Sequence, residues 1–340
     1  MTCPRCSLGT GRLFIRSIPV QWKQFRTTQT AGYIFILLGI LNWSGNFVAA
    51  RGLAGHIDPA TLNLFRWFLA TLIFMPFGFG AFWRERHVVK RMWKEICFLA
   101  LTGISLYDTL VFIAGHTSEA LNMSLISTLS PLLTSLVAQF IFKEKLKPRM
   151  YMGIALSTFG IVMLVTDGHF SRLATLHFAR GDLLILCTAM MSAAYNTTIS
   201  RIAGKISQPA LVMSLGLMGT AQIIPLYLWE TGGTIILPPC TPTLVWSLLY
   251  LAIFASILCF LFWNEAVHIL GAPKAMLFYY TLPPISGLVA WLVIDEPVSF
   301  VQFFSGMIIL AGILFALYGG IPKPRRWKAK HYGQPAEIAN

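Results

Sequence analysis

Asn42-Trp-Ser-Gly-Asn-Phe-Val-Ala-Ala-Arg51, at the end of the first long apolar run, is the stretch of sequence that decides the fold. Three positions in or just after it recur 150 residues later, where Asn46, Arg51 and Pro59 match Asn196, Arg201 and Pro209. Eight further positions recur with an offset of 152, namely Ala114, His116, Ala120, Pro131, Val137, Ala138, Glu144 and Gly160, which match Ala266, His268, Ala272, Pro283, Val289, Ala290, Glu296 and Gly312. Two copies of one membrane unit are typical of secondary transporters.

The composition places most of the chain in a lipid bilayer. The 340 residues are 56% hydrophobic and only 11% charged, whereas a soluble domain has about 25% charged residues. The apolar surface must therefore face lipid or other lipid-embedded helices. The net charge of +13 could suggest nucleic acid as a partner. Because the Lys and Arg residues lie in short loops and tails, we expect no nucleic acid to bind.

Ten apolar runs are long enough to span, or nearly span, a bilayer core. They cover 31–50, 60–82, 96–115, 120–142, 150–166, 182–200, 210–229, 243–267, 275–294 and 298–319. Helices are the expected conformation, because an isolated strand would leave its backbone polar groups unsatisfied in lipid. The predicted fold class is an all-α integral membrane protein with ten transmembrane helices.

The basic residues predict the orientation. With the N-terminus inside, 22 of the 26 Lys and Arg residues fall in cytoplasmic segments and 3 fall in external loops, which is a strong positive-inside pattern. Each copy holds five helices, and because five is odd the second copy must be inverted relative to the first. We expect a bacterial-type inner (plasma) membrane protein with both termini cytoplasmic and its basic C-terminal tail against anionic lipid.

The same counting predicts how the chain is divided. Residues 1–30 form a basic cytoplasmic tail, 31–166 the first five-helix repeat, 167–180 an external linker, 181–321 the second five-helix repeat, and 322–340 a second basic cytoplasmic tail. The oligomeric state is left open between a monomer and a homodimer.

A proline, a turn glutamate and two glycines follow one another in each half. The first half has Pro131, Glu144, Gly153 and Gly160, and the second has Pro283, Glu296 and Gly312 but Ser305 in place of the first glycine. Together with the Asn42–Arg51 stretch, this pattern resembles the EamA-type proteins of the drug/metabolite transporter superfamily. The resemblance covers about residues 31–320. It implies ten helices, a central cavity between helices 1, 3, 4 and 6, 8, 9, and export or exchange of a small metabolite.

Pro131 and Pro283 fall near the middle of the fourth and ninth predicted helices. A proline inside a helix cannot donate its backbone hydrogen bond and clashes with the carbonyl four residues earlier. The carbonyls of Ser127 and Tyr279 would be freed, and matched helix breaks in two halves point to a transport path. The alternative is a packing kink that neighbouring helices stabilise.

The candidates for lining a cavity are polar or aromatic side chains within these runs. They are Trp43, Asn46, Tyr107, Asp108, Ser127, Tyr195, Asn196, Trp263, Tyr279 and Tyr280. Amides and hydroxyls could bind a solute, and aromatic rings could stack on it. The alternatives are contacts between helices and, for the rings, core packing or interface anchoring.

Two charges lie within the predicted spans of the first half. Asp108 stands near the centre of the third helix, where a carboxylate costs about 3 kcal/mol or more. It is a candidate site for proton coupling or for a substrate ammonium, or else a carboxyl bonded to a neighbouring helix. Arg66 could meet a substrate carboxylate or Asp108, although its place near the outer end of the second helix favours an outward, snorkelling side chain.

The sequence contains no Walker-type phosphate loop and no HExxH or GxSxG motif, which disfavours ATP-driven transport and hydrolytic enzymes. We expect no enzyme activity, no cofactor and no metal. The predicted function is transport of a small solute by alternating access, with amino-acid export as the leading hypothesis. Uptake or exchange of another metabolite, such as a nucleotide sugar, and a non-transporting membrane sensor or assembly subunit are the alternatives.

Overall fold

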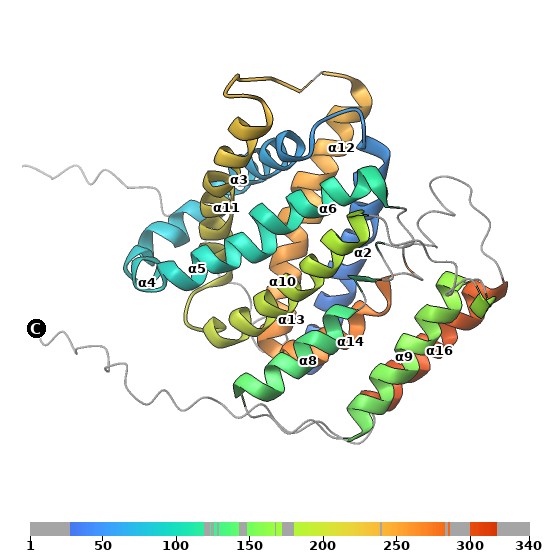
Figure 1. The fold of residues 1–340 in the computed structure, drawn as a ribbon. Coiled ribbons are helices and arrows are strands. Elements are labelled where there is room, and N and C mark those ends of the chain that lie inside the picture. The colour runs from blue at the N-terminus through green and yellow to red at the C-terminus, as the bar shows by residue number, and fades with distance from the viewer. Residues whose placement is uncertain are drawn as a thin grey trace, which may run out of the picture.

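The computed structural model describes residues 28–118, 123, 126–127, 129–142, 148–166, 168–171, 180–238, 240–282, 285 and 300–317. Helices dominate this part of the chain (Figure 1). In order they are α2 (Gln29–Leu53), α3 (Pro59–Arg84), α4 (Arg86–Arg91), α5 (Trp93–Ala100), η1 (Leu101–Ser105), α6 (Leu106–Thr117), α8 (Leu129–Phe142), α9 (Pro148–Thr166), α10 (Arg180–Ile202), α11 (Gln208–Glu230), α12 (Pro242–Ala252), η3 (Ile253–Leu258), α13 (Cys259–Leu270), α14 (Ala272–Tyr279) and α16 (Phe300–Leu317).

The protein is an all-α membrane protein. Each of the ten predicted spans contains a helix within the described residues, and the ninth is described mainly by the short α14. Five helical stretches in this part of the chain are long and apolar enough to cross a membrane, namely Pro59–Arg84, Trp93–Thr117, Arg180–Ile202, Gln208–Glu230 and Pro242–Leu270. The loop predicted between the second and third spans also contains a short helix, α4, which the pattern of apolar runs does not predict.

The outer faces of the helices expose large apolar side chains such as Phe68, Phe77 and Leu314. These groups would be costly in water but suit the hydrocarbon of a bilayer. Exposed tryptophans stand near the helix ends, with Trp83 and Trp93 at one end of the bundle and Trp229 at the other. Tryptophan is enriched at both membrane interfaces, so this placement agrees with a bundle that crosses the bilayer.

Helices α3 and α11, the second helix of each half, form an antiparallel pair with reciprocal caps. Glu230, the last residue of α11, accepts hydrogen bonds from the backbone N–H of Ala60 at 3.0 Å and of Thr61 at 2.9 Å. At the other end, Glu85 follows α3 and accepts from the N–H of Ser207 at 2.9 Å, just before α11 begins. A carboxylate at a helix N-terminus satisfies free N–H groups and the helix dipole, so each helix stabilises the start of its partner.

Helices α9 and α16 lie side by side at one edge of the bundle (Figure 1). A Cβ added at Gly153 would lie 2.4 Å from Cβ of Ala316, and one at Gly312 would lie 2.4 Å from Oγ of Ser157. The two helix backbones therefore approach more closely than a side chain at either glycine would allow. Small residues are the usual means of such packing between membrane helices.

Two π-helical segments interrupt the third and eighth helices at matched positions. η1 covers Leu101–Ser105 and η3 covers Ile253–Leu258, so their first residues are separated by the repeat offset of 152. Each lies between two α-helical pieces, α5 and α6 in one half and α12 and α13 in the other. π-helical bulges frequently occur at functional sites, and both segments lie beside the polar network described next.

Candidate solute site between the two halves

A buried ion pair lies at the centre of the candidate site. Nη1 of Arg66 lies 3.3 Å from Oδ1 of Asp108, and the two side chains are 0% and 4% exposed. The second carboxylate oxygen of Asp108 accepts a hydrogen bond from Nε1 of Trp67 at 2.9 Å. Both oxygens of Asp108 thus have a donor, which a buried carboxylate requires.

Arg66 also connects the two halves. Its Nη1 donates to Oδ1 of Asn46 at 3.3 Å in the first half. Its Nε donates to Oγ of Ser256 at 2.8 Å, and its Nη2 donates to the carbonyl of Ala255 at 3.1 Å, both on η3 of the second half. The outward, snorkelling orientation favoured from the sequence is therefore wrong, because each of the three guanidinium nitrogens of Arg66 lies next to an oxygen acceptor inside the bundle.

The rings of Trp67 and Phe112 complete the surroundings of Arg66. Its guanidinium carbon lies 5.7 Å from the centroid of the Trp67 ring and 5.8 Å from that of Phe112. Cation–π contacts of this kind are stronger when water is excluded. The cation is held by hydrogen bonds, by one opposite charge and by aromatic faces.

An aromatic cluster adjoins the ion pair on the side of the second half. Trp67 meets Phe260 edge-on with ring centroids 5.1 Å apart, and Tyr195 lies 6.0 Å from the same phenylalanine. Trp43 lies 4.9 Å from Trp263. Tyr279 is within ring contact of both tryptophans, at 6.3 Å from Trp43 and 6.0 Å from Trp263. The predicted aromatic candidates of helices 1, 6, 8 and 9 therefore come together.

The repeat-matched asparagines both act as acceptors in this region. Oδ1 of Asn46 accepts from Arg66, and Oδ1 of Asn196 accepts from Nε1 of Trp263 at 2.8 Å. The neighbouring Tyr195 donates its hydroxyl to Oδ1 of Asn264 at 2.8 Å. Nδ2 of Asn264 is buried and has no hydrogen-bond partner among the described residues. An unpaired donor beside an aromatic cluster is a place where a solute oxygen could bind.

Two further candidates join the cluster from the first half. Tyr107 shares a side-chain hydrogen bond with Tyr279, and Tyr279 shares another with Ser127. Tyr280 does not belong to the cluster. Its hydroxyl lies 3.2 Å from Oγ1 of Thr158, and its ring packs among apolar residues of α9 and α16. The structure therefore does not bring Tyr280 together with the other candidates, since consecutive side chains at the end of α14 point in different directions.

The predicted helix breaks are described only in part. Pro131 is buried two residues after the first residue of α8, and Pro283 lies outside the described residues. In the ninth helix, α14 ends at Tyr279. The N–H of Tyr280 then bonds to the carbonyl of Leu277, and that of Thr281 to the carbonyl of Phe278, so the last turn is tightened. Regular α-helix therefore ends close to where the sequence placed the second break.

Several residues of the network were not among the sequence candidates. Trp67 and Phe260 read as ordinary apolar core, and Ser256 as one more small residue in an apolar run. Asn264 carried the clearest signal, because it is an amide within an apolar span. Asn63 carried a similar signal, and its Nδ2 donates to the carbonyls of Ile104 and Ser105 at η1.

The fold and the site define a class of protein. Two helical halves with matched irregular backbone, joined by a buried polar network, are the architecture of a secondary transporter. A profile of the EamA-like transporter family matches the chain twice, over residues 30–166 and 179–318. The chain belongs to this family, and it is a transporter rather than an enzyme.

Named relatives are similar over most of their length. The uncharacterized transporter YyaM of Bacillus subtilis is 24% identical over 83% of this chain and 92% of that protein. The "Probable amino-acid metabolite efflux pump" of Escherichia coli is 28% identical over 84% of this chain and 94% of that protein. The "Probable terminal-alkyne amino-acid exporter" of Streptantibioticus cattleyicolor is 23% identical over 82% of this chain and 91% of that protein.

A protein of known crystal structure has the same fold. It is 18% identical, with a TM-score of 0.69 over 85% of this chain and 97% of that chain. At this level of identity the similarity shows the fold alone.

Proposed function

We propose that the protein exports small zwitterionic solutes, amino acids above all, and that Arg66 and Asp108 recognise the two charged groups of the solute. The observation that carries the proposal is the buried ion pair between these residues, which lies where the two halves meet. Buried ionisable groups within a membrane bundle are costly, and they are most often functional.

A zwitterion matches this pair in sign and in number. Its carboxylate can take the place of Asp108 on Arg66, while its ammonium binds the Asp108 carboxylate. Each protein charge then keeps an opposite partner, which limits the desolvation cost of opening the pair. The side chain of the solute would rest against the rings of Trp43, Trp263 and Tyr279, and Nδ2 of Asn264 offers a further donor.

The contacts of Arg66 also suggest how binding is linked to transport. The guanidinium holds Asp108 and Asn46 of the first half together with η3 of the second half. A solute carboxylate that draws Arg66 away would release the contacts to Ser256 and Ala255. The halves could then rock against each other, which is how inverted-repeat transporters alternate access.

The names of two relatives support an amino-acid solute, since both refer to amino-acid export. The charge of the network argues against a nucleotide sugar. Within the described network Arg66 is the cation that faces Asp108. A diphosphate could therefore pair one of its two negative charges with Arg66, and it would leave its other charge and the Asp108 carboxylate without a cation.

We further propose that both termini lie in the cytoplasm of a bacterial-type plasma membrane, as the distribution of Lys and Arg favours. The chain would act as a monomer or homodimer without a cofactor, and its basic C-terminal tail would contact anionic lipids.

The direct test is counterflow in proteoliposomes against a panel of amino acids, organic acids and amines, with and without a pH gradient. Zwitterions should exchange much faster than the acids or amines of the same skeleton, and both Arg66→Gln and Asp108→Asn should abolish exchange. Equal rates for a zwitterion and its methyl ester would contradict a role for Arg66 in binding the carboxylate. Unchanged exchange and an unchanged pH profile in Asp108→Asn would remove Asp108 from the mechanism.

A further inference from the structure

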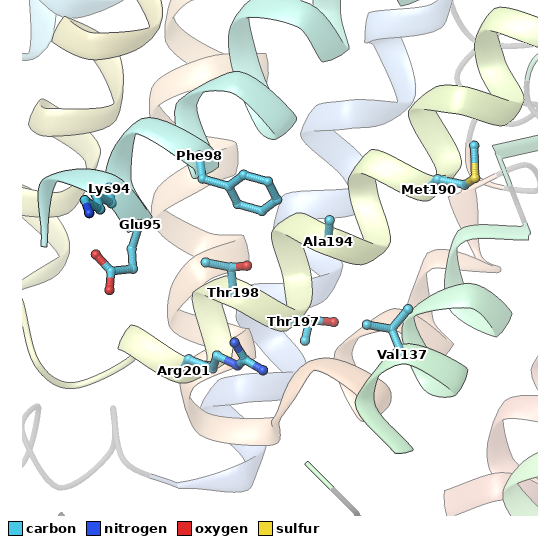
Figure 2. A pocket seen from close by; sticks show the side chains of 9 residues that line it. All are labelled: Lys94, Glu95, Phe98, Val137, Met190, Ala194, Thr197, Thr198 and Arg201. Atoms are coloured by element: carbon cyan, nitrogen blue, oxygen red, sulfur yellow. The ribbon is translucent and has the colours of Figure 1, made fainter. Parts of the chain in front are cut away.

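A groove of about 470 Å³ lies over one face of α10, between α5 and α8 (Figure 2). Its volume is within the range of small-molecule sites. Its lining includes no member of the Arg66–Asp108 pair or of the aromatic cluster around Trp263. The groove is therefore separate from the candidate solute site.

The groove has a charged end and an apolar end. Figure 2 shows Lys94, Glu95 and Arg201 towards one end, and Met190 at the other. Met190 and Arg201 are eleven residues apart on α10, a rise of about 16 Å along the helix. An elongated, amphipathic occupant fits this distribution better than a compact polar one.

The apolar end faces the surroundings of the bundle. Phe98 on α5 is 43% exposed and Met190 on α10 is 53% exposed, although both lie within helical stretches long and apolar enough to cross a membrane. Exposed apolar side chains on such helices face lipid hydrocarbon. An acyl chain lying along Phe98, Ala194 and Met190 would continue that hydrocarbon into the groove.

The charged end lies where basic residues gather. The C-terminal end of α3, helix α4 and the start of α5 contribute Arg84, Arg86, Lys90, Arg91 and Lys94, and the end of α10 contributes Arg201. Among the lining residues that the structure describes there are two cations and one carboxylate, since Glu95 accompanies Lys94 and Arg201. A head group that carries a phosphate and an ammonium matches both signs, whereas a purely anionic head group leaves Glu95 without a partner.

We propose that this groove binds a phosphatidylethanolamine-type lipid from the leaflet at the basic end of the bundle. Lys94 and Arg201 bind the phosphate, Glu95 binds the ammonium, and one acyl chain lies along α10 towards Met190. Arginine is well suited to phosphate oxygens because its N–H groups form a planar fork. Basic pockets between membrane helices are known places for lipid head groups.

The experiment is native mass spectrometry of the full-length protein, released from detergent with equal amounts of phosphatidylethanolamine, phosphatidylcholine and phosphatidylglycerol of the same chain length. We expect the wild type to retain phosphatidylethanolamine about tenfold more tightly than the other two, which is the order of effect of one hydrogen bond to a charged group. The Lys94→Gln/Arg201→Gln double variant should lose this preference. Lys90→Gln is the matched control, because it removes an exposed cation from the same end but outside the groove.

Two further variants separate the head group from the chain. Ala194→Phe fills the apolar part while leaving the charges, and it should weaken retention of all three lipids. Glu95→Gln should raise phosphatidylglycerol to the level of phosphatidylethanolamine. Retention of phosphatidylethanolamine that is equal in the wild type and in Ala194→Phe would overturn the site. A wild type that prefers phosphatidylglycerol would overturn the assignment of the head group. Neither result depends on which solute is transported.

Discussion

The third and eighth helices have matching backbone geometry but differ in the side chains that they place beside it. Both change from α to π geometry at matched positions, at Leu101–Ser105 in the first half and at Ile253–Leu258 in the second. Asp108 follows in the first half, and its counterpart 152 residues later is Phe260. The repeat therefore accounts for where the irregular backbone lies, and the residues that break the repeat supply the charge.

Arg66, the partner of Asp108, also has no charged counterpart at the matched position of the second half. At the repeat offset of 150, Arg66 corresponds to Gly216 on α11, where an added Cβ would lie 2.6 Å from Oγ1 of Thr71. The second half thus has close helix packing where the first half has a cation. Because Arg66 and Asp108 are matched by Gly216 and Phe260 in the other half, the site has a positive and a negative side, which suits a solute with different groups at its two ends.

The largest expected effect comes from making the first half resemble the second. Asp108→Phe leaves Arg66 buried without its counter-charge, which should cost about 3–5 kcal/mol of unfolding free energy. Transport should be lost as well. The measurement is the free energy of unfolding by SDS titration in mixed micelles, together with proteoliposome exchange.

A double variant separates the coupling between Arg66 and Asp108 from the contribution of each residue alone. Arg66→Met/Asp108→Leu replaces both charges with apolar groups of similar size, so it should be more stable than Asp108→Phe while remaining inactive. The two single variants, Arg66→Met and Asp108→Leu, complete the comparison. If the loss of unfolding free energy in the double variant equalled the sum of the losses in the single variants, the two residues would not be coupled as the 3.3 Å contact implies.

The next effect concerns the glycine that only the first half has. Gly153→Ser copies the residue found at 305 in the second half, but its Cβ would lie 2.4 Å from Cβ of Ala316. Overpacking of this kind typically costs about 1–3 kcal/mol. The same SDS titration measures it, with Gly80→Ser as the control, since a Cβ at Gly80 meets nothing within 4 Å. Equal losses in the two variants would point to helix propensity rather than to packing of α9 on α16.

The reciprocal caps of α3 and α11 offer a smaller comparison. Glu230→Gln should lose more stability than Glu85→Gln. The carboxylate of Glu230 accepts from two backbone N–H groups and from the hydroxyl of Thr61, whereas within the described part of the chain the carboxylate of Glu85 accepts from the backbone N–H of Ser207. Losses of about 0.5–2 kcal/mol are typical of helix caps. A larger loss for Glu85→Gln would show that the caps do not act as the contacts indicate.

Part of the site could be read from the sequence because apolar spans make polar residues visible. Asp108, Asn46 and Asn196 stood out in this way, and the structure places all three in one buried region. The orientation of Arg66 could not be read, because its acceptors Ser256 and Ala255 lie about 190 residues away in the chain.

The two π-helical segments could not be predicted from the sequence either. Leu101–Ser105 and Ile253–Leu258 consist of residues that suit an ordinary membrane helix. Side chains of the second helix donate to carbonyls of both segments, Asn63 to Ile104 and Ser105 and Arg66 to Ala255, and these are contacts between residues far apart in the chain. Tyr279 and Tyr280 look alike in the sequence, and only the helix geometry separates them into different clusters. The sequence thus shows which residues are polar or aromatic, whereas the direction in which each side chain points depends on contacts with residues far away in the chain.

The smallest effect tests the reverse exchange between the halves. Ser305→Gly gives the second half the glycine of the first, and it removes a buried hydroxyl that has no hydrogen-bond partner among the described residues. Glycine inside a helix costs roughly 0.5–1 kcal/mol relative to alanine, and loss of an unpaired hydroxyl offsets part of that cost. The unfolding free energy should therefore fall by less than about 1 kcal/mol, with Ser305→Ala more stable than Ser305→Gly in the same titration. A loss as large as that of Gly153→Ser would mean that α16 needs a side chain at 305 for its packing, and the two halves would then differ in how their last helices are held.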